Sequence, residues 1–315
     1  AIDWVQPGAV RPVARPEPKP PLEVRPAGLS VTEIETLVRD PYAIYARRVL
    51  DLEELDPLGQ APDYALRGTL IHDALGEFTR VWQGDYGDAA LAALLAQGRE
   101  SLAEIEGFPD THAIWSYRFR AIARWLIAFE AQRDPLIERR NAEIGGHIEI
   151  PVDLPGGTFR LRGRADRIDL RKDGRVDILD FKTGTPPSAK QVLTGLAPQL
   201  ALEAAMVRAG GFDPAFAGRS IATLAWIGLS KVDRAEPLKS AVEQGQTADG
   251  VGDIAMAQLR TLLDAFANPE RAYVSRARPM FETRYESPYD HLARVREWGL
   301  VESEEDLEWF GPPTP

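Results

Sequence analysis

The chain has 315 residues, of which 44% are hydrophobic and 27% are charged, and it contains no cysteine. This composition is that of a globular protein with one large or two ordinary domains, and it excludes disulfides, a thiol nucleophile and a cysteine-ligated cluster. A net charge of −11 argues against a protein that coats DNA. The sequence shows no signal-peptide pattern and no apolar run near the roughly 20 residues of a membrane span, so we expect a cytoplasmic protein.

Residues 1–28 form a proline-rich stretch, with prolines at positions 7, 12, 16, 18, 20, 21 and 26. Proline lacks a backbone N–H and fixes φ, so this stretch is not expected to form a helix or a central strand. We predict a linker over 1–28 that follows a missing N-terminal region, and a single domain over 29–315. A proline-rich ligand for a small adaptor domain is the alternative.

Two short helices are predicted after the linker. Ser30-Val31-Thr32-Glu33 has the pattern of a capping box, in which the side chains of Ser30 and Glu33 accept each other's backbone N–H groups. Apolar residues continue at helical spacing, and Pro41 separates this helix from the next one.

Three longer helices are predicted over residues 67–80, 89–106 and 114–140 from their apolar periodicity. The first carries His72 near its start. A lone histidine is more often a packed or exposed residue than a metal ligand. Alternation of apolar and polar residues then predicts a strand over 142–152. Its Glu149 is either a further acidic ligand or an exposed sheet residue, and we predict the exposed residue.

A β-hairpin is predicted over residues 160–184. Lys172-Asp173-Gly174 suits a three-residue loop in which Gly174 adopts positive φ. In that register Arg171 faces Arg175, so Asp166 falls opposite Asp180. Directly opposed residues place their Cβ atoms about 4.5–5.5 Å apart on one face of the sheet.

Lys182 follows Asp180 by two residues, so its side chain is expected on the same face as both carboxylates. Carboxylates are hard oxygen ligands of the kind that Mg²⁺ prefers, and a nearby lysine can orient water or neutralise charge that develops on a phosphate. The pattern therefore predicts a metal site. The alternative is an exposed hairpin with solvated charges, because Asp-x-Lys is short and common.

The remaining elements are predicted as a helix over 188–209, a strand over 221–229 that pairs with the central sheet, a loop over 236–252 and an amphipathic helix over 254–266. No internal repeat and no phosphate-binding loop of the Gly-x₄-Gly-Lys-Ser/Thr type is present, so no ATP chemistry is expected of this chain.

Four separated motifs are similar, in order, to those of RecB-like nucleases of the PD-(D/E)XK superfamily. They are Arg67-Gly68-Thr69-Leu70-Ile71-His72, Gly163-Arg164-Ala165-Asp166-Arg167-Ile168-Asp169, Leu179-Asp180-Phe181-Lys182-Thr183-Gly184 and Ala197-Pro198-Gln199-Leu200. Residues 29–34, 40–45, 289–292 and 296–298 also resemble the nuclease domain that closes the AddB family of helicase–nuclease subunits. The resemblance runs from about Leu29 to Trp298.

The resemblance implies an α/β fold, with a central mixed β-sheet flanked by helices, and a Mg²⁺-dependent exonuclease in which Mn²⁺ can substitute. It implies that His72, Asp166, Asp180 and the Phe181 carbonyl hold the metal. Lys182 would position the attacking hydroxide, and Gln199 would bind phosphate or orient the lysine.

The implied partners are DNA, mainly an unwound single strand, and the AddA helicase–nuclease subunit, in double-strand break repair by homologous recombination. Another RecB-like exonuclease and a catalytically silent scaffold remain alternatives. Retention of His72 together with Asp166, Asp180 and Lys182 favours an enzyme over a scaffold.

Two departures from the family pattern affect these expectations. Asp40 stands where cluster-bearing relatives have a cysteine, so no iron–sulfur cluster is expected. Glu203 stands where the family often has a tyrosine, which removes an expected aromatic DNA contact.

Charge near the hairpin is locally basic. Residues 160–190 hold nine Lys or Arg and five Asp. This balance fits a nuclease whose main grip on DNA lies elsewhere. Further arginines in the tail could line the exit of a single strand or be ordinary surface charge; they are Arg276, Arg278, Arg284, Arg294 and Arg296, ahead of an acidic stretch over 302–308.

Overall fold

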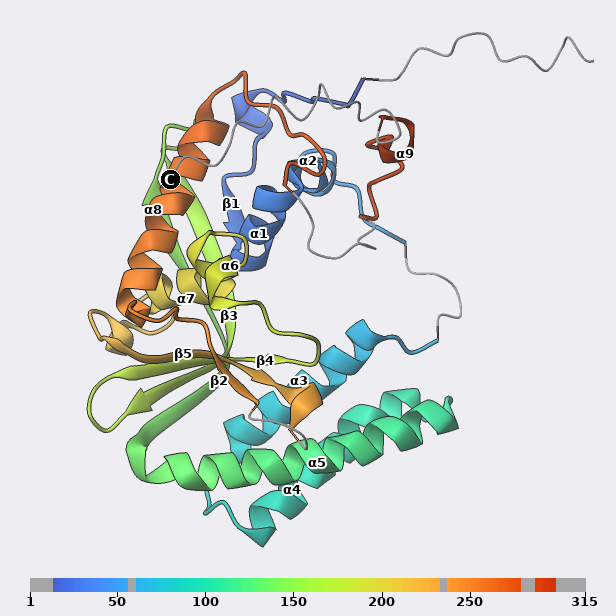
Figure 1. Cartoon of the computed structure of the whole chain (residues 1–315), viewed down its shortest axis with the longest axis vertical. Coiled ribbons are helices and arrows are strands. Elements are labelled where there is room, and N and C mark those ends of the chain that lie inside the picture. The colour runs from blue at the N-terminus through green and yellow to red at the C-terminus, as the bar shows by residue number, and fades with distance from the viewer. Residues whose placement is uncertain (1–13, 56–60, 233–236, 279–286, 299–315) are drawn as a thin grey trace, which may run out of the picture. The chain divides into compact units, whose positions relative to one another are not determined.

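The computed structural model describes residues 14–55, 61–232, 237–278 and 287–298 (Figure 1). The chain divides into two compact units. One comprises Ala1–Pro26, Thr36–Glu54 and Ala265–Pro315, and the other comprises Ala27–Glu35 and Leu55–Asp264. No helix in the described part of the chain is long and apolar enough to cross a membrane.

Arg25 organises the first unit. Its buried guanidinium donates to the carbonyl oxygens of Pro20, Phe266, Asn268 and Pro269 and lies 5.6 Å from the ring centroid of Tyr273. A buried cation needs its donors satisfied, and these four carbonyls satisfy them. The proline-rich residues directly before it are therefore held against the segment that follows residue 265.

Helices α2 (Pro41–Arg48) and α9 (Val295–Trp298) complete the first unit with a small apolar cluster. In the tail, Arg276 and Arg294 form ion pairs with Asp290 and Glu297. Arg284 and the acidic stretch over 302–308 lie outside the described residues.

Helix α1 (Val31–Arg39) begins with the predicted capping box: Glu33 accepts the N–H of Ser30 at 2.8 Å and the Ser30 hydroxyl accepts that of Glu33 at 3.1 Å.

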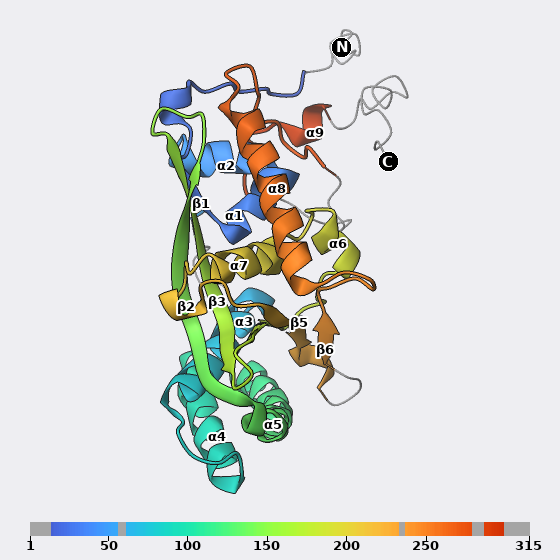
Figure 2. The ribbon, with the colours of Figure 1, turned by 90° about the vertical axis from the view of Figure 1, so that its left-hand side faces the viewer.

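A mixed sheet forms the centre of the second unit, as predicted. Its strands are β1 (Gly28–Ser30), β2 (Ile137–Pro151), β3 (Thr158–Arg171), β4 (Val176–Lys182), β5 (Ile221–Gly228) and β6 (Leu238–Ser240). The order is β1-β3-β4-β5-β6, with β2 along β3 (Figure 2). Pairs β1–β3 and β4–β5 are parallel, whereas β2–β3, β3–β4 and β5–β6 are antiparallel.

The β3–β4 hairpin has the predicted register. Ile168 pairs with Ile178 and Asp169 pairs with Asp177, and Gly174 has φ of 83°. The paired residues run from Arg167–Leu179 to Leu170–Val176. Loop chemistry and side-chain alternation were sufficient to set this register because a slip of one residue would expose the apolar face.

Helices cover both faces of the sheet (Figures 1 and 2). Helices α3 (Tyr64–Val81), α4 (Asp88–Leu102) and α5 (Pro109–Arg133) share an apolar core with Leu179 and Phe181 of β4. Asp180 points the other way, toward α7 (Gln199–Arg208). This division follows from the strand period, which sends successive side chains to opposite faces.

Buried ion pairs tie the sheet to these helices beside Asp166. Arg167, which is 1% exposed, donates to Thr79 of α3 and Glu130 of α5 at 3.0 Å each and pairs with Asp169. Arg133 of α5 bridges Asp169 and Asp177 at 2.8 Å each. Every charge in this network has a partner of opposite sign, which is the condition for burying it.

Three predicted boundaries are wrong. The helix predicted over 114–140 ends at Arg133, and residues 137–140 belong to β2. Pro135 has no N–H to continue the α-helical hydrogen bonds, and the chain passes through a 3-10 turn over Asp134–Leu136 before it becomes extended at Ile137. The helix predicted over 188–209 is divided into α6 (Ala189–Leu193) and α7, because Gly195 has φ of 72° and Pro198 follows.

The third correction concerns residues 236–252, predicted as a loop. They contain β6 and the first turn of α8 (Ala248–Ala267). Glycines suggested a loop, but Gly252 has a packing role: a Cβ there would lie 3.3 Å from the Ala205 nitrogen and 3.4 Å from the Ala201 carbonyl oxygen. The glycine therefore lets α8 approach α7 closely.

Candidate active site

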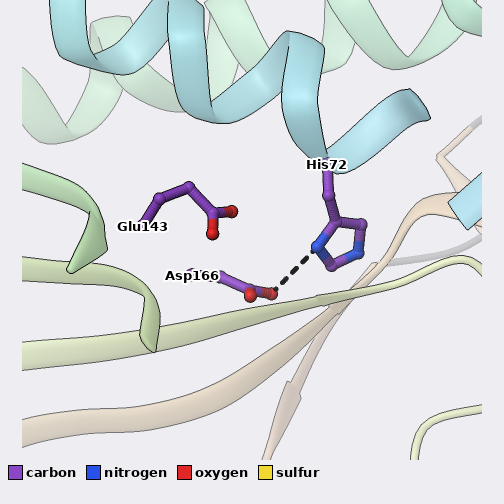
Figure 3. A group of neighbouring side chains, drawn as sticks. All are labelled: His72, Glu143 and Asp166. Carbon is purple, nitrogen blue, oxygen red and sulfur yellow. Dashed lines mark ion pairs between the residues drawn. The ribbon is translucent and has the colours of Figure 1, made fainter. Parts of the chain in front are cut away.

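Three side chains that can bind a metal converge at the point where β3 passes under α3 (Figure 3). His72 comes from α3, Glu143 from β2 and Asp166 from β3, and one ligand atom of each lies within 4.8 Å of the others. The Nδ1 atom of His72 lies 3.3 Å from Oδ2 of Asp166. One imidazole nitrogen and two carboxylates form a donor set of the kind that holds divalent cations.

Strand pairing places Glu143 in this group. Ala142 pairs with Arg167 and Ile144 pairs with Ala165, so Glu143 lies opposite Asp166. Glu143 has φ of 52°, which is unusual for a residue with a side chain. A Cβ at Gly76 of α3 would lie 2.7 Å from Glu143 Cγ, so this glycine makes room for the glutamate.

Asp166 lies where the hairpin opens. Beyond the Arg167–Leu179 pair, the Oδ2 atom of Asp166 accepts the backbone N–H of Phe181 at 2.8 Å. The Asp166 carboxylate thus accepts a hydrogen bond from the backbone of β4, which fixes its position just beyond the paired part of the hairpin. The ring of Phe181 meets the imidazole of His72 edge-on, with 6.1 Å between centroids.

A second group lies on the α7 side of β4. The Nζ atom of Lys182 is 2.9 Å from Oδ2 of Asp180, and the amide of Gln199 donates to Oδ1 of Asp180 at 2.9 Å. Gln199 also accepts from Lys182 at 3.4 Å and donates to Glu203 at 3.2 Å. Glu203 is buried, 1% exposed, so the residue at the usual tyrosine position is a member of this network and has no surface to offer DNA.

Burial, and then neighbouring carboxylates, raise the pKa of acidic side chains in both groups. Burial and then the charge of Asp166 raise the pKa of Glu143. Burial raises the pKa of Asp180 to about 6; the charge of Lys182 opposes the rise and that of Asp166 adds to it. Burial and then Asp180 raise the pKa of Glu203 well above its ordinary value. Crowded carboxylates of this kind are relieved by a bound cation.

The pKa values of the two basic groups of the site, His72 and Lys182, are raised as well. Burial lowers the pKa of His72, but its hydrogen bond to Asp166 and the charge of Asp166 outweigh burial and leave the pKa raised. Burial likewise lowers the pKa of Lys182, and the charge of Asp180 more than restores it. Both shifts favour the protonated form of these side chains beside the carboxylates.

The predicted site residues divide between the two groups. His72 and Asp166 lie in the first group, and Asp180, Lys182 and Gln199 lie in the second. The two groups are close enough for the charge of Asp166 to raise the pKa of Asp180. Glu149 is an exposed sheet residue, as predicted, paired with Arg160 at 2.7 Å. Sequence reasoning missed Glu143. Its position opposite Asp166 depends on the β2–β3 register, and the signal that could have indicated it is the turn at Pro155-Gly156-Gly157, where Gly157 has φ of 69°.

Replacing Glu143 by Gln is expected to weaken binding of Mn²⁺ by at least about 10-fold, because one of three converging donors loses its charge. Glu149→Gln on the same strand is the matched control and should leave affinity unchanged, since Glu149 contacts Arg160 outside the group. Calorimetric titration of both variants with Mn²⁺ measures the difference. Equal affinity of the two variants would remove Glu143 from the site.

Glu203→Gln is expected to stabilise the metal-free fold at neutral and alkaline pH. Folding raises the pKa of Glu203, so the folded protein loses stability as the pH increases from the pKa of the unfolded chain toward that of the folded protein. Each pKa unit of this shift corresponds to about 1.4 kcal/mol of folding free energy. The glutamine keeps an acceptor for Gln199. Melting temperatures from pH 4 to 8 in EDTA should therefore diverge with rising pH, the variant being higher. A gap that stays constant with pH would show that Glu203 titrates normally.

A central mixed sheet with helices on both faces, and with carboxylates and a lysine at its opened hairpin, defines a restriction-endonuclease-like α/β protein. The sequence model of the PD-(D/E)XK nuclease superfamily matches residues 28–284. The chain belongs to this superfamily, whose members are typically nucleases that use divalent metal.

Curated relatives are much longer than this chain. An uncharacterized protein of Rickettsia conorii is 34% identical over 191 residues, which are 59% of this chain and 23% of the relative. One from Rickettsia typhi is 33% identical over 192 residues, 60% of this chain and 22% of the relative. A subunit of an ATP-dependent helicase/deoxyribonuclease from Moorella thermoacetica is 29% identical over 201 residues, 56% of this chain and 17% of that protein. The chain thus spans about a quarter of the length of the first of these.

Proposed function

We propose that the chain is a metal-dependent DNA nuclease domain that hydrolyses phosphodiester bonds of an unwound single strand. The observation that carries the proposal is the convergence of His72, Glu143 and Asp166 beside the Asp180–Lys182 pair, in a chain of the PD-(D/E)XK superfamily. A surface hairpin with solvated charges would not crowd these groups enough to raise the pKa of Glu143 and of Asp180.

In this proposal His72, Glu143, Asp166 and Asp180 hold a divalent ion, Mg²⁺ or Mn²⁺, with the Phe181 carbonyl as a further ligand. When bound, such an ion polarises a phosphodiester and makes water a stronger nucleophile. Hard oxygen donors and one imidazole fit either ion.

The chain's own residues then position the reaction. Lys182 places an ammonium beside the attacked phosphate, where it orients water and neutralises developing charge. Gln199 holds both members of the Asp180–Lys182 pair through its amide, so it fixes the direction in which the ammonium points. It is a positioning residue.

The finer assignment is an exonuclease of the AddB kind that works with an AddA helicase–nuclease partner in double-strand break repair, which would place the protein in the cytoplasm. The similarity to the helicase/deoxyribonuclease subunit of Moorella thermoacetica supports it. A catalytically silent nuclease-fold scaffold is the second candidate, and the retained lysine and metal-binding group argue against it.

Cleavage of labelled single-stranded DNA tests the proposal. Linear DNA labelled at either end, and circular single-stranded DNA, should be incubated with Mg²⁺, with Mn²⁺ and with EDTA. An exonuclease degrades only the linear DNA, and only with metal. Cleavage in EDTA would contradict metal dependence, cutting of the circle would contradict an exonuclease, and no cleavage in any condition would favour the scaffold.

A further inference from the structure

A groove of about 410 Å³ between α3 and α5 is lined by four arginines. They are Arg67 of α3 and Arg118, Arg120 and Arg124 of α5. Among the residues that the structure describes, none of the four has a carboxylate within ion-pair distance. Further along the same helix, Arg133 is held by two aspartates, so pairing is available elsewhere in the fold.

Positive charge is concentrated in this groove although the chain carries a net charge of −11. Burial and then the charge of Arg118 lower the pKa of Arg67, so the two guanidiniums repel each other. Like charges gathered without counter-charges cost stability, and a bound polyanion removes that cost. The arginines therefore match a ligand with several phosphates.

Exposed aromatic rings accompany the arginines. Tyr117 lines the groove with 73% of its surface exposed, and Tyr64, 79% exposed, has its ring 5.0 Å from the guanidinium carbon of Arg67. Exposed rings beside cationic side chains are the surface on which unstacked bases of single strands bind. The bases of a duplex are stacked on each other and cannot reach such rings.

The groove opens beside the candidate active site. Ile71, the neighbour of His72 on α3, lines it, and so does Thr183, the neighbour of Lys182 at the end of β4. Arg67 precedes His72 by five residues on one helix, which is about 7.5 Å along the axis. A single strand held in the groove would thus lie against the same helix and the same strand that carry His72 and Lys182.

We propose that the α3–α5 groove binds a short run of single-stranded DNA, with the arginines on its phosphates and Tyr117 against a base, and delivers it to the active site. The proposal rests on the nuclease function proposed above and adds the surface that binds the substrate and the residues that contact it.

Binding without cleavage tests the groove by itself. Affinity of the 315-residue chain for a fluorescent oligo-dT is measured by anisotropy in EDTA at several salt concentrations. Arg118→Ala/Arg124→Ala should bind at least about 10-fold more weakly, and the slope of log affinity against log salt should fall by about 0.7 for each phosphate that the variant no longer neutralises. Arg99→Ala/Arg260→Ala is the matched control: both are exposed helical arginines, on α4 and α8, and no ion pair is found for either among the described residues.

Equal losses in the groove variant and in the control would overturn the proposal, because they would reflect net charge alone. An unchanged salt slope in the groove variant would overturn it as well.

The aromatic contact has its own pair of variants. Tyr117→Ala should weaken binding of the single strand by about 10-fold, and Tyr117→Phe should restore it, since stacking needs the ring and not the hydroxyl. A matched duplex should bind more weakly than the single strand and should not respond to Tyr117. Tighter binding of the duplex, or no effect of Tyr117→Ala, would contradict the single-strand assignment.

These readouts separate the groove from the nuclease. If the parent protein never cleaves DNA but the groove variants bind the single strand more weakly, the groove proposal is supported and the proposed nuclease function is contradicted. Metal-dependent cleavage of linear single strands that is as fast in the groove variants as in the parent would defeat the groove alone.

Discussion

Asp180→Asn is expected to abolish metal-dependent cleavage, a loss of about 10³-fold or more, while the fold stays as stable as the parent or more so. The carboxylate is buried and its pKa is raised to about 6, which means that folding disfavours its charged form even with Lys182 beside it. Asparagine keeps the size and the acceptor for Gln199 and removes the charge that a metal ion needs.

The pH dependence of stability checks the physical reason. Because folding raises this pKa from its ordinary 3.8, the parent loses stability in EDTA as pH rises from about 4 through about 6, and the Asn variant does not lose that part. Thermal melts at pH 4, 6 and 8 and single-turnover cleavage at pH 8 measure both halves. A variant that still cleaves, or one that melts far below the parent at pH 8, contradicts the assignment of Asp180.

Lys182→Ala is expected to separate metal binding from catalysis. The ammonium competes with a metal ion for Asp180, and the charge of Asp180 keeps the pKa of Lys182 raised against burial. Removing it should leave Mn²⁺ affinity unchanged or tighter, and cleavage should fall by roughly 10²-fold or more, the scale of losing a positioned catalytic group.

Lys190→Ala on α6 is the control for loss of a lysine near the sheet, because Lys190 makes no ion pair among the described residues and is exposed. Mn²⁺ affinity and single-turnover rate are measured on both variants. Weaker metal binding in Lys182→Ala would mean that the lysine supports the site structurally, and an unchanged rate would remove it from catalysis.

The sequence was most informative where a local rule decides the geometry. Turn chemistry and the period of two set the β3–β4 register from Arg167–Leu179 to Leu170–Val176. The predicted pairing of Asp166 with Asp180 lies just beyond this ladder, where Asp166 contacts His72 and Asp180 contacts Gln199 of α7. The capping box at Ser30 and the break at Pro41 were predictable for the same reason, since caps and prolines act within a few residues.

Glu143 was missed although the turn at Pro155-Gly156-Gly157 sets how β2 aligns with β3. Its approach to His72 also needs the space that Gly76 leaves on a third element, and that depends on tertiary packing. The α3–α5 groove is also a product of tertiary packing, because it joins Arg67 to residues about 50 positions later. In the groove, side chains meet through contacts that no local spacing encodes.

Arg167 connects the elements that carry the candidate active site to the helices that form the groove. Its guanidinium joins β3 to Thr79 of α3 and to Glu130 of α5. One side chain thereby joins three elements: β3, which carries Asp166, α3, which carries His72, and α5, which carries three of the groove arginines. In the proposed nuclease, a single strand held along α5 would therefore reach the carboxylates at a set distance, because one buried side chain joins α3 and α5 to the strand that carries Asp166.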